Sequence, residues 1–158
     1  MRSLPAMVDQ RIEAALAGLW TSCLGVVTRV DHARYRVDAR PKVKLPDEAG
    51  ALQELPIVQD VRIAMSHGKN FSLILPVAEG DVGLLVFSKY PLQELAKDSK
   101  TRDPALRRRF SVNDCVYVPF TWLDAENVPA HNANDLHIVN TAGDIYLKAK
   151  NIRMEKVA

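Results

Sequence analysis

The sequence has few aromatic residues, almost no excess of charge and no long apolar run. Aromatic side chains make up 6% of its 158 residues, and the formal net charge is +2. Proteins that bind nucleic acid usually carry a basic surface with aromatic rings for base stacking, so this balance argues against that class, although it leaves room for a local patch. No apolar run approaches the roughly 20 residues that a membrane-spanning helix needs. The N-terminus has no signal-peptide pattern, so we expect synthesis in the cytosol.

Cysteine is also scarce, since only Cys23 and Cys115 occur. Each lies in an alternating apolar run, where a buried free thiol behaves as a small hydrophobic side chain. Two cysteines do not make a disulfide framework. We therefore predict free thiols, with a single disulfide as the alternative.

Patterns typical of catalytic and metal sites are missing as well. The sequence has no nucleophile elbow and no glycine-rich phosphate loop. Glu79 and Asp81 could in principle serve acid–base chemistry, but they flank Gly80 between two apolar segments and are typical of a hairpin turn. No metal-ligand spacing links the four histidines, which are His32, His67, His131 and His137. We expect no enzymatic activity, no cofactor and no metal.

What the sequence does contain is 47% hydrophobic residues, placed mostly in short periodic segments. In residues 4–19 the apolar side chains recur every three or four positions, which predicts a helix that ends near Gly18. This helix packs either on its own chain or on a neighbouring protein.

A run of strand-like segments follows the predicted helix. Short turns join them without a helical period, which predicts five strands in an all-β, OB-type Greek-key barrel. The first and last segments are apolar on both faces, so they are either the most enclosed strands or face a neighbouring subunit. The predicted strands are residues 20–30, 35–43, 55–65, 71–77 and 82–88.

The stretch after these strands is more polar. A helix of one or two turns is expected within residues 91–100, an alternating segment returns at 111–120, and a linker occupies 121–135. The basic window Arg107–Arg109 could clamp phosphate, as oligonucleotide-binding OB barrels do. Because only Phe110 supplies an aromatic ring nearby, solvated arginines or ion pairs between subunits are the favoured interpretation.

The C-terminal segment, residues 136–158, alternates like a β-ribbon around a turn at Gly143. One side is apolar, and a corner near Lys150–Asn151 would keep later apolar residues on that side. Exposed strand edges invite pairing with other copies, and closed cyclic symmetry ends such pairing. We therefore predict that three copies wind together, with a hairpin folded on the chain's own barrel as the alternative. The predicted trimer interface consists of Leu136, Ile138, Ile145, Leu147, Ala149, Ile152 and Met154.

Four stretches taken in order resemble the membrane-puncturing central spike of contractile phage-tail baseplates. They are "LPIVQDVRIAM", "FSLILPVAEGDVGLLVFSKYPLQEL", "DPALRRRFSVNDCVYVPF" and "LHIVNTAGDIYLKAK". The resemblance implies a homotrimer in the virion, with barrels at the baseplate hub beneath the tail tube. It also implies a triple-stranded β-helical needle that pierces the host outer membrane when the tail contracts.

The sequence departs from this family at the needle tip. Family members often close the needle with paired histidines that bind iron, but no His-x-His pattern occurs here, so the metal is not carried over. Either a separate tip protein caps the trimer or the spike is blunt. The leading helix is expected to contact the tube or a hub protein.

The predicted fold class is thus all-β, with an N-terminal helix (1–19), an OB-like barrel with a connecting arm (20–120), a linker (121–135) and an intertwined trimeric β-helix (136–158). The predicted function is that of a structural spike. A single-stranded nucleic-acid-binding OB module is the alternative.

Overall fold

The computed structural model describes residues 4–47, 49–103, 109–119, 123, 130 and 132–152. The chain divides into two units, Met1–Leu123 and Asp124–Ala158. All helices and strands of the described residues belong to the first unit. In chain order they are α1 (Leu4–Ala17), β1 (Ser22–Asp31), β2 (Arg36–Pro41), β3 (Lys44–Pro46), β4 (Leu52–Glu54), β5 (Val58–Ile63), β6 (Ser66–Gly68), β7 (Phe71–Leu73), β8 (Val82–Phe87), α2 (Leu92–Leu95) and β9 (Cys115–Val118).

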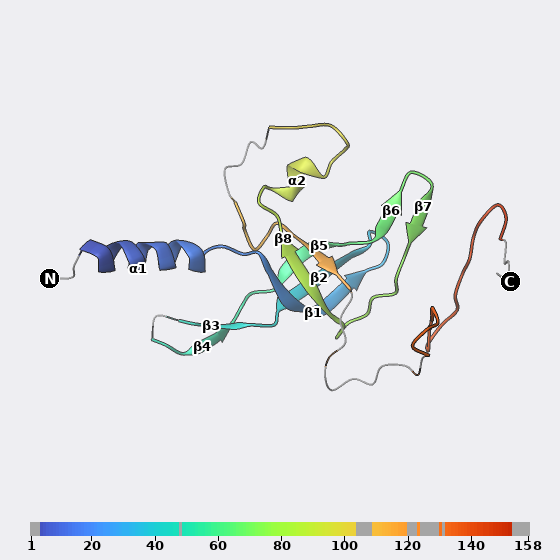
Figure 1. The fold of residues 1–158 in the computed structure, drawn as a ribbon, viewed down its shortest axis with the longest axis horizontal. Coiled ribbons are helices and arrows are strands. Elements are labelled where there is room, and N and C mark those ends of the chain that lie inside the picture. The colour runs from blue at the N-terminus through green and yellow to red at the C-terminus, as the bar shows by residue number, and fades with distance from the viewer. Residues whose placement is uncertain are drawn as a thin grey trace. The chain divides into compact units, whose positions relative to one another are not determined.

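Five strands close into a barrel in the order β1–β2–β5–β9–β8, with β8 returning to β1 (Figure 1). The β5–β9 pair is parallel, and the other four neighbouring pairs are antiparallel. Closure leaves no free edge among these strands. The predicted all-β barrel of five strands is confirmed.

The barrel core follows from the period-2 alternation of its strands. Val27, Val37, Leu85 and Tyr117 are each at most 2% exposed, and Cys115 joins them from β9. Fully burying an aliphatic side chain of this size contributes roughly 1.5–3 kcal/mol. The core is therefore supplied by one chain alone.

Two glycines face each other across β1 and β8 and make room for large core side chains. Gly25 pairs with Gly83, and both are buried. A Cβ atom on Gly83 would lie 2.6 Å from Cζ of Tyr117 and 2.6 Å from the Val118 carbonyl oxygen. A Cβ atom on Gly25 would lie 2.7 Å from Cδ1 of Leu85. The narrow barrel accommodates Leu85 and Tyr117 because these two positions lack side chains.

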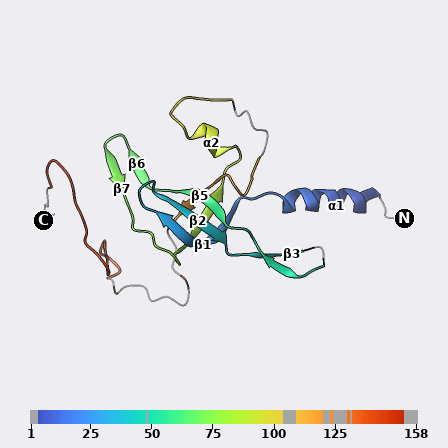
Figure 2. The same ribbon diagram turned by 180° about the vertical axis from the view of Figure 1, so that it is seen from behind.

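The prediction that residues 71–77 form a barrel strand is wrong. Residues 71–73 instead pair with residues 66–68, which were expected to be only a connection, and form the hairpin β6–β7 outside the barrel (Figure 2). Phe71 is 62% exposed, and only Val77 at the far end of the segment reaches the core. The vacant place between β5 and β8 is taken by β9, from the segment predicted to follow the barrel.

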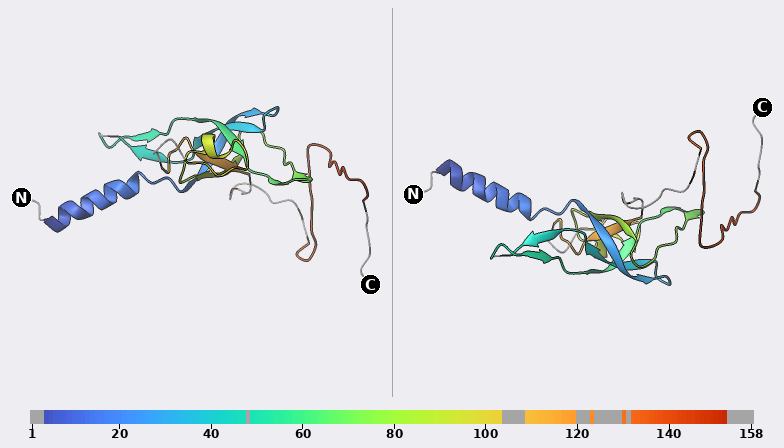
Figure 3. Two further views of the ribbon diagram at one scale, coloured as in Figure 1. Left: turned by 90° about the horizontal axis from the view of Figure 1, so that it is seen from above. Right: turned by 90° about the horizontal axis from the view of Figure 1, so that it is seen from below.

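A second hairpin, β3–β4, interrupts the chain between β2 and β5. At its turn, Asp47 Oδ1 accepts hydrogen bonds from the backbone N–H groups of Ala49 and Ala51. Both hairpins lie outside the ring of barrel strands in the views from above and below (Figure 3). Every residue of the two hairpins' strands is exposed.

The short helix α2 lies between β8 and β9, so it is part of the barrel's connections and does not follow the barrel. Its first residue is tied to the strand that comes after it, because the Leu92 N–H donates to Oδ1 of the buried Asp114 at 3.1 Å. The N-terminal helix is present as predicted and ends at Ala17, immediately before Gly18. None of its apolar side chains between Leu4 and Leu16 is buried.

The second unit is described for residues 130 and 132–152, and none of these residues forms a strand. The expected turn is present: Oδ1 of Asn140 accepts hydrogen bonds from the backbone N–H groups of Ala142 and Gly143 at 3.1 and 3.0 Å. We call residues 136–152 the tail.

Candidate functional site

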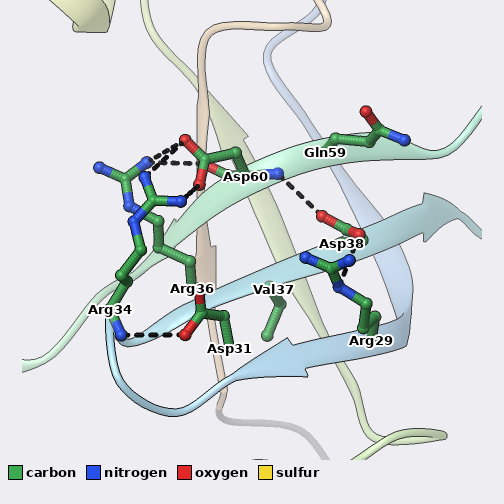
Figure 4. A pocket seen from close by; sticks show the side chains of 8 residues that line it. All are labelled: Arg29, Asp31, Arg34, Arg36, Val37, Asp38, Gln59 and Asp60. Atoms are coloured by element: carbon green, nitrogen blue, oxygen red, sulfur yellow. Dashed lines mark hydrogen bonds and ion pairs between the residues drawn. The ribbon is translucent and has the colours of Figure 1, made fainter.

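A cavity of about 200 Å³ on the outside of β1, β2 and β5 is lined almost entirely by charged and polar side chains (Figure 4). It lies where β5 carries an irregularity: Val37 pairs with Val61, but Ala39 pairs with Val58, so two residues of β5 face one of β2. Asp60 takes a left-handed backbone conformation (φ 58°) at this bulge. The bulge explains why Val58 and Val61 are both buried although an odd number of positions separates them.

The carboxylate of Asp60 lies between Arg34 of the β1–β2 turn and Arg36, the first residue of β2. Oδ1 of Asp60 is 2.9 Å from Nη1 of Arg34, and Oδ2 is 2.8 Å from Nη1 of Arg36. On the other side, Asp38 Oδ1 accepts the Asp60 backbone N–H at 2.9 Å, and Asp38 Oδ2 lies 3.3 Å from Nε of Arg29. The three arginines in this cavity are thus paired with carboxylates of the same chain.

Such a network holds strands together and leaves little charge for a ligand. Exposed ion pairs contribute roughly 0.2–1 kcal/mol each. Sequence reasoning missed the cluster. A usable signal existed, because Val58 and Val61 break the alternation of β5, and a break of parity in a barrel strand indicates a bulge.

Apart from Met154, the predicted trimer interface lies in the tail, and its described members are all exposed. Leu136 is 91% exposed and Leu147 is 69% exposed. Residues 132–152 form no strand, so the described part of the tail shows neither a paired ribbon nor the alternative of a paired hairpin within one chain. Met154 lies outside the described residues. The interface stays a prediction, with described members Leu136, Ile138, Ile145, Leu147, Ala149 and Ile152.

Both cysteines are free thiols, as predicted. Cys115 is buried, and burial, assisted by nearby Cys23 and Asp114, raises its pKa to about 12. Cys23 is half-buried, and burial raises its pKa as well. Thiols that resist ionisation are poor nucleophiles and poor metal ligands, so these two act as core side chains.

The remaining candidate residues are dispersed. His32, His67 and His137 are exposed, and His131 lies outside the described residues. Nδ1 of His67 lies 2.7 Å from Oγ of Ser72 across the β6–β7 hairpin. Among the residues that the structure describes, no group of three histidine, cysteine or carboxylate side chains could hold a metal ion. The predicted turn at Gly80 is present, with φ at +92°.

The basic window is described only at its end. Arg107 and Arg108 lie outside the described residues, and the Arg109 guanidinium lies 5.6 Å from the centre of the Tyr90 ring. This contact is a cation–π interaction within the chain. No helix in the described part of the chain has the length and apolar character needed to span a membrane.

The fold places the chain in a class of small proteins built on a closed five-stranded barrel, with two appended hairpins and a separate C-terminal unit. The family described as "Phage protein Gp138 N-terminal domain" matches residues 24–120, which is more than half of the chain. The chain therefore belongs to this phage protein family. The match extends from within β1 past β9 and so covers the whole barrel except the start of β1. No curated protein matches the chain.

Family membership and the barrel together support a structural protein of a bacteriophage. They give no support to the alternative of a nucleic-acid-binding module. The matched range ends before the tail, so the role of the tail has to be argued from its own residues.

Proposed function

We propose that the chain is a homotrimeric central spike or hub protein of a phage-tail baseplate, in which three tails form a β-helical needle. Its role is mechanical and not catalytic, and its place is in the virion. The single observation that carries this proposal is the tail: its apolar residues alternate over two segments, yet they are exposed and unpaired as strands in one chain.

An alternating ribbon becomes stable when its apolar side is covered and its edges are paired. Leu136 and Ile138 precede the turn at Asn140, and Ile145 and Leu147 follow it. Three copies around a common axis would turn these side chains inward and give each edge a partner strand. Continuous hydrogen bonding between chains would then supply the rigidity that a spike needs.

The barrel fits the hub part of the proposal. Numbered along the chain, its five strands have the order 1–2–3–5–4, and the third and fifth strands run parallel. This arrangement supports an OB-type Greek-key barrel, the fold expected for the hub. The barrels would lie beneath the tail tube, and the exposed apolar side chains of α1 suit a contact with a tube or hub protein.

Light scattering on the full chain tests the trimer directly. We expect the mass of three chains, and a monomer would contradict the proposal. A truncation that ends at Asp135 tests whether the residues after it provide most of the energy of trimer assembly. We expect this truncation to be monomeric, with the barrel still folded. Trp20 reports on the barrel, because its ring lies 5.3 Å from the Phe87 ring. The fluorescence experiments use chains with Trp122→Phe, since Trp122 is the second tryptophan of the sequence.

A further inference from the structure

The outer face of three adjacent barrel strands is apolar. Register places Leu24 of β1 beside Leu84 of β8 and Leu84 beside Val118 of β9, while Val86 lies beside Val116. All of these side chains alternate with core residues and therefore lie on the outside of the barrel. Leu24 and Val86 are exposed, and the others are partly exposed. We call this surface the β1–β8–β9 face.

A second apolar surface lies on the β6–β7 hairpin and the residues just after it. Phe71, Leu73 and Ile74 are all more than half exposed. We call residues 66–75 the β6–β7 arm. A two-stranded hairpin is marginally stable in water unless something packs on it, and Phe71, Leu73 and Ile74 give this arm an apolar surface suited to a partner.

The base of the arm is fixed by Tyr35 in the β1–β2 turn. The Tyr35 hydroxyl donates to the Leu75 carbonyl oxygen at 2.9 Å and accepts the Leu75 backbone N–H at 3.2 Å. Tyr35 adopts φ 51°, a left-handed conformation that costs energy for a residue with a side chain. These two hydrogen bonds join the base of the arm to the β1–β2 turn, while the apolar side chains of the arm remain exposed.

We propose that the β6–β7 arm of one copy packs on the β1–β8–β9 face of the next copy. The inference rests on the proposed trimer, because a cyclic trimer joins two different surfaces of the same chain at each interface. The arm and the face are two such surfaces. Charge also matches: Lys69 is at the tip of the arm, and Glu79 and Asp81 border the face in the turn before β8. Acidic and basic groups at these places fix the register of packing.

Cysteine pairs test the contact in the full chain. The double variant Leu73→Cys with Val86→Cys should form a disulfide between chains under mild oxidation, seen as linked chains on a denaturing gel. The inter-chain disulfide should not form in either single variant. It should also not form when Val86→Cys is combined with Leu52→Cys on the β3–β4 hairpin. Leu52 is a matched control because it is an exposed leucine on the other hairpin, 67% exposed against 51% for Leu73.

Aspartate variants measure the energy of the same contact. Leu73→Asp and Val86→Asp should each raise the concentration at which the trimer dissociates by at least about tenfold, whereas Leu52→Asp should leave it unchanged. If the wild type is a trimer but the 73–86 disulfide does not form, this inference is overturned and the trimer stands. If the wild type is a monomer, both proposals fail.

Discussion

The barrel strands and the tail alternate apolar and polar residues in the same way, yet their apolar side chains are found in opposite surroundings. In the barrel, Val37 is 1% exposed and Leu85 is fully buried, while in the tail Leu136 and Leu147 are largely exposed. The alternation therefore predicts which side of a strand is apolar, but it does not tell which chain covers that side.

Strand edges explain the difference. Closure of the barrel pairs both edges of every barrel strand and encloses a core at the same time. The tail has two short segments, too few to close on themselves. We infer that a segment of this kind is stable only when other copies supply its edges.

The largest effect is expected when a charge is placed on the apolar side of the tail. In the proposed needle, Leu147→Asp places a charge on the buried axis, so the trimer should be lost while the barrel stays folded. Tyr146→Asp is the matched control, because Tyr146 is exposed and lies on the other side of the alternation. Light scattering gives the mass, and Trp20 fluorescence gives the melting of the barrel. Equal behaviour of the two variants would refute the assignment of the apolar side.

The next effect breaks the barrel and leaves the tail intact. Gly83→Ala inserts a methyl group against the Tyr117 ring and the Val118 carbonyl group. Overpacking of this kind costs about 3 kcal/mol or somewhat less. Gly68→Ala is the control, since a Cβ atom there would meet nothing within 4 Å. The free energy of unfolding is measured in denaturant by Trp20 fluorescence. Equal values for the two variants would contradict the close packing inferred at Gly83.

The stability of the barrel should depend on pH through the buried thiol of Cys115. Burial raises the pKa of Cys115 to about 12, so the folded barrel keeps the thiol protonated where the unfolded chain, with a thiol pKa near ~8.5, has lost the proton. This contribution is complete below about pH 8.5 and is lost as pH rises toward 12. Between pH 7 and pH 10 the free energy of unfolding should fall by about 2 kcal/mol from this group. In Cys115→Ala that part of the decrease should be absent, and an unchanged pH profile would show that the thiol is not responsible.

The smallest effect concerns the charged cavity. Asp60→Asn weakens the ion pairs to Arg34 and Arg36, whose exposed positions limit the loss to about 1 kcal/mol. High salt should reduce the difference between wild type and variant. Glu54→Gln is the control, because it also weakens an exposed ion pair, the one with Arg40. A loss of several kcal/mol for Asp60→Asn would mean that the cluster does more than hold the bulge.

The sequence predicted the elements whose determinants are local. The helix was expected at 4–19 and occupies Leu4–Ala17, and the strands β1, β2, β5 and β8 fall inside their predicted ranges to within one residue. The turns predicted at Gly80 and Gly143 are present.

Prediction from the sequence failed where strands pair with segments that are distant in the chain. The segment 71–77 has the same alternation as a barrel strand, but β9 fills that place and pairs in parallel with β5. No local pattern distinguishes these two candidates, since both present alternating apolar side chains. The charged cavity was missed for a related reason, because a bulge in β5 brings Asp38 and Asp60 together across two strands.

Amide hydrogen exchange in the full chain distinguishes a tail that other copies cover from one that is exposed to solvent. If other copies cover the tail, the amides of residues 136–152 should be protected in the trimer and should exchange within seconds when dilution produces monomers. The barrel amides of β1 and β8 should stay protected in both states. Tail amides that exchange as fast as an unfolded peptide in a stable trimer, or that are protected in a monomer, would rule out a needle formed by three tails.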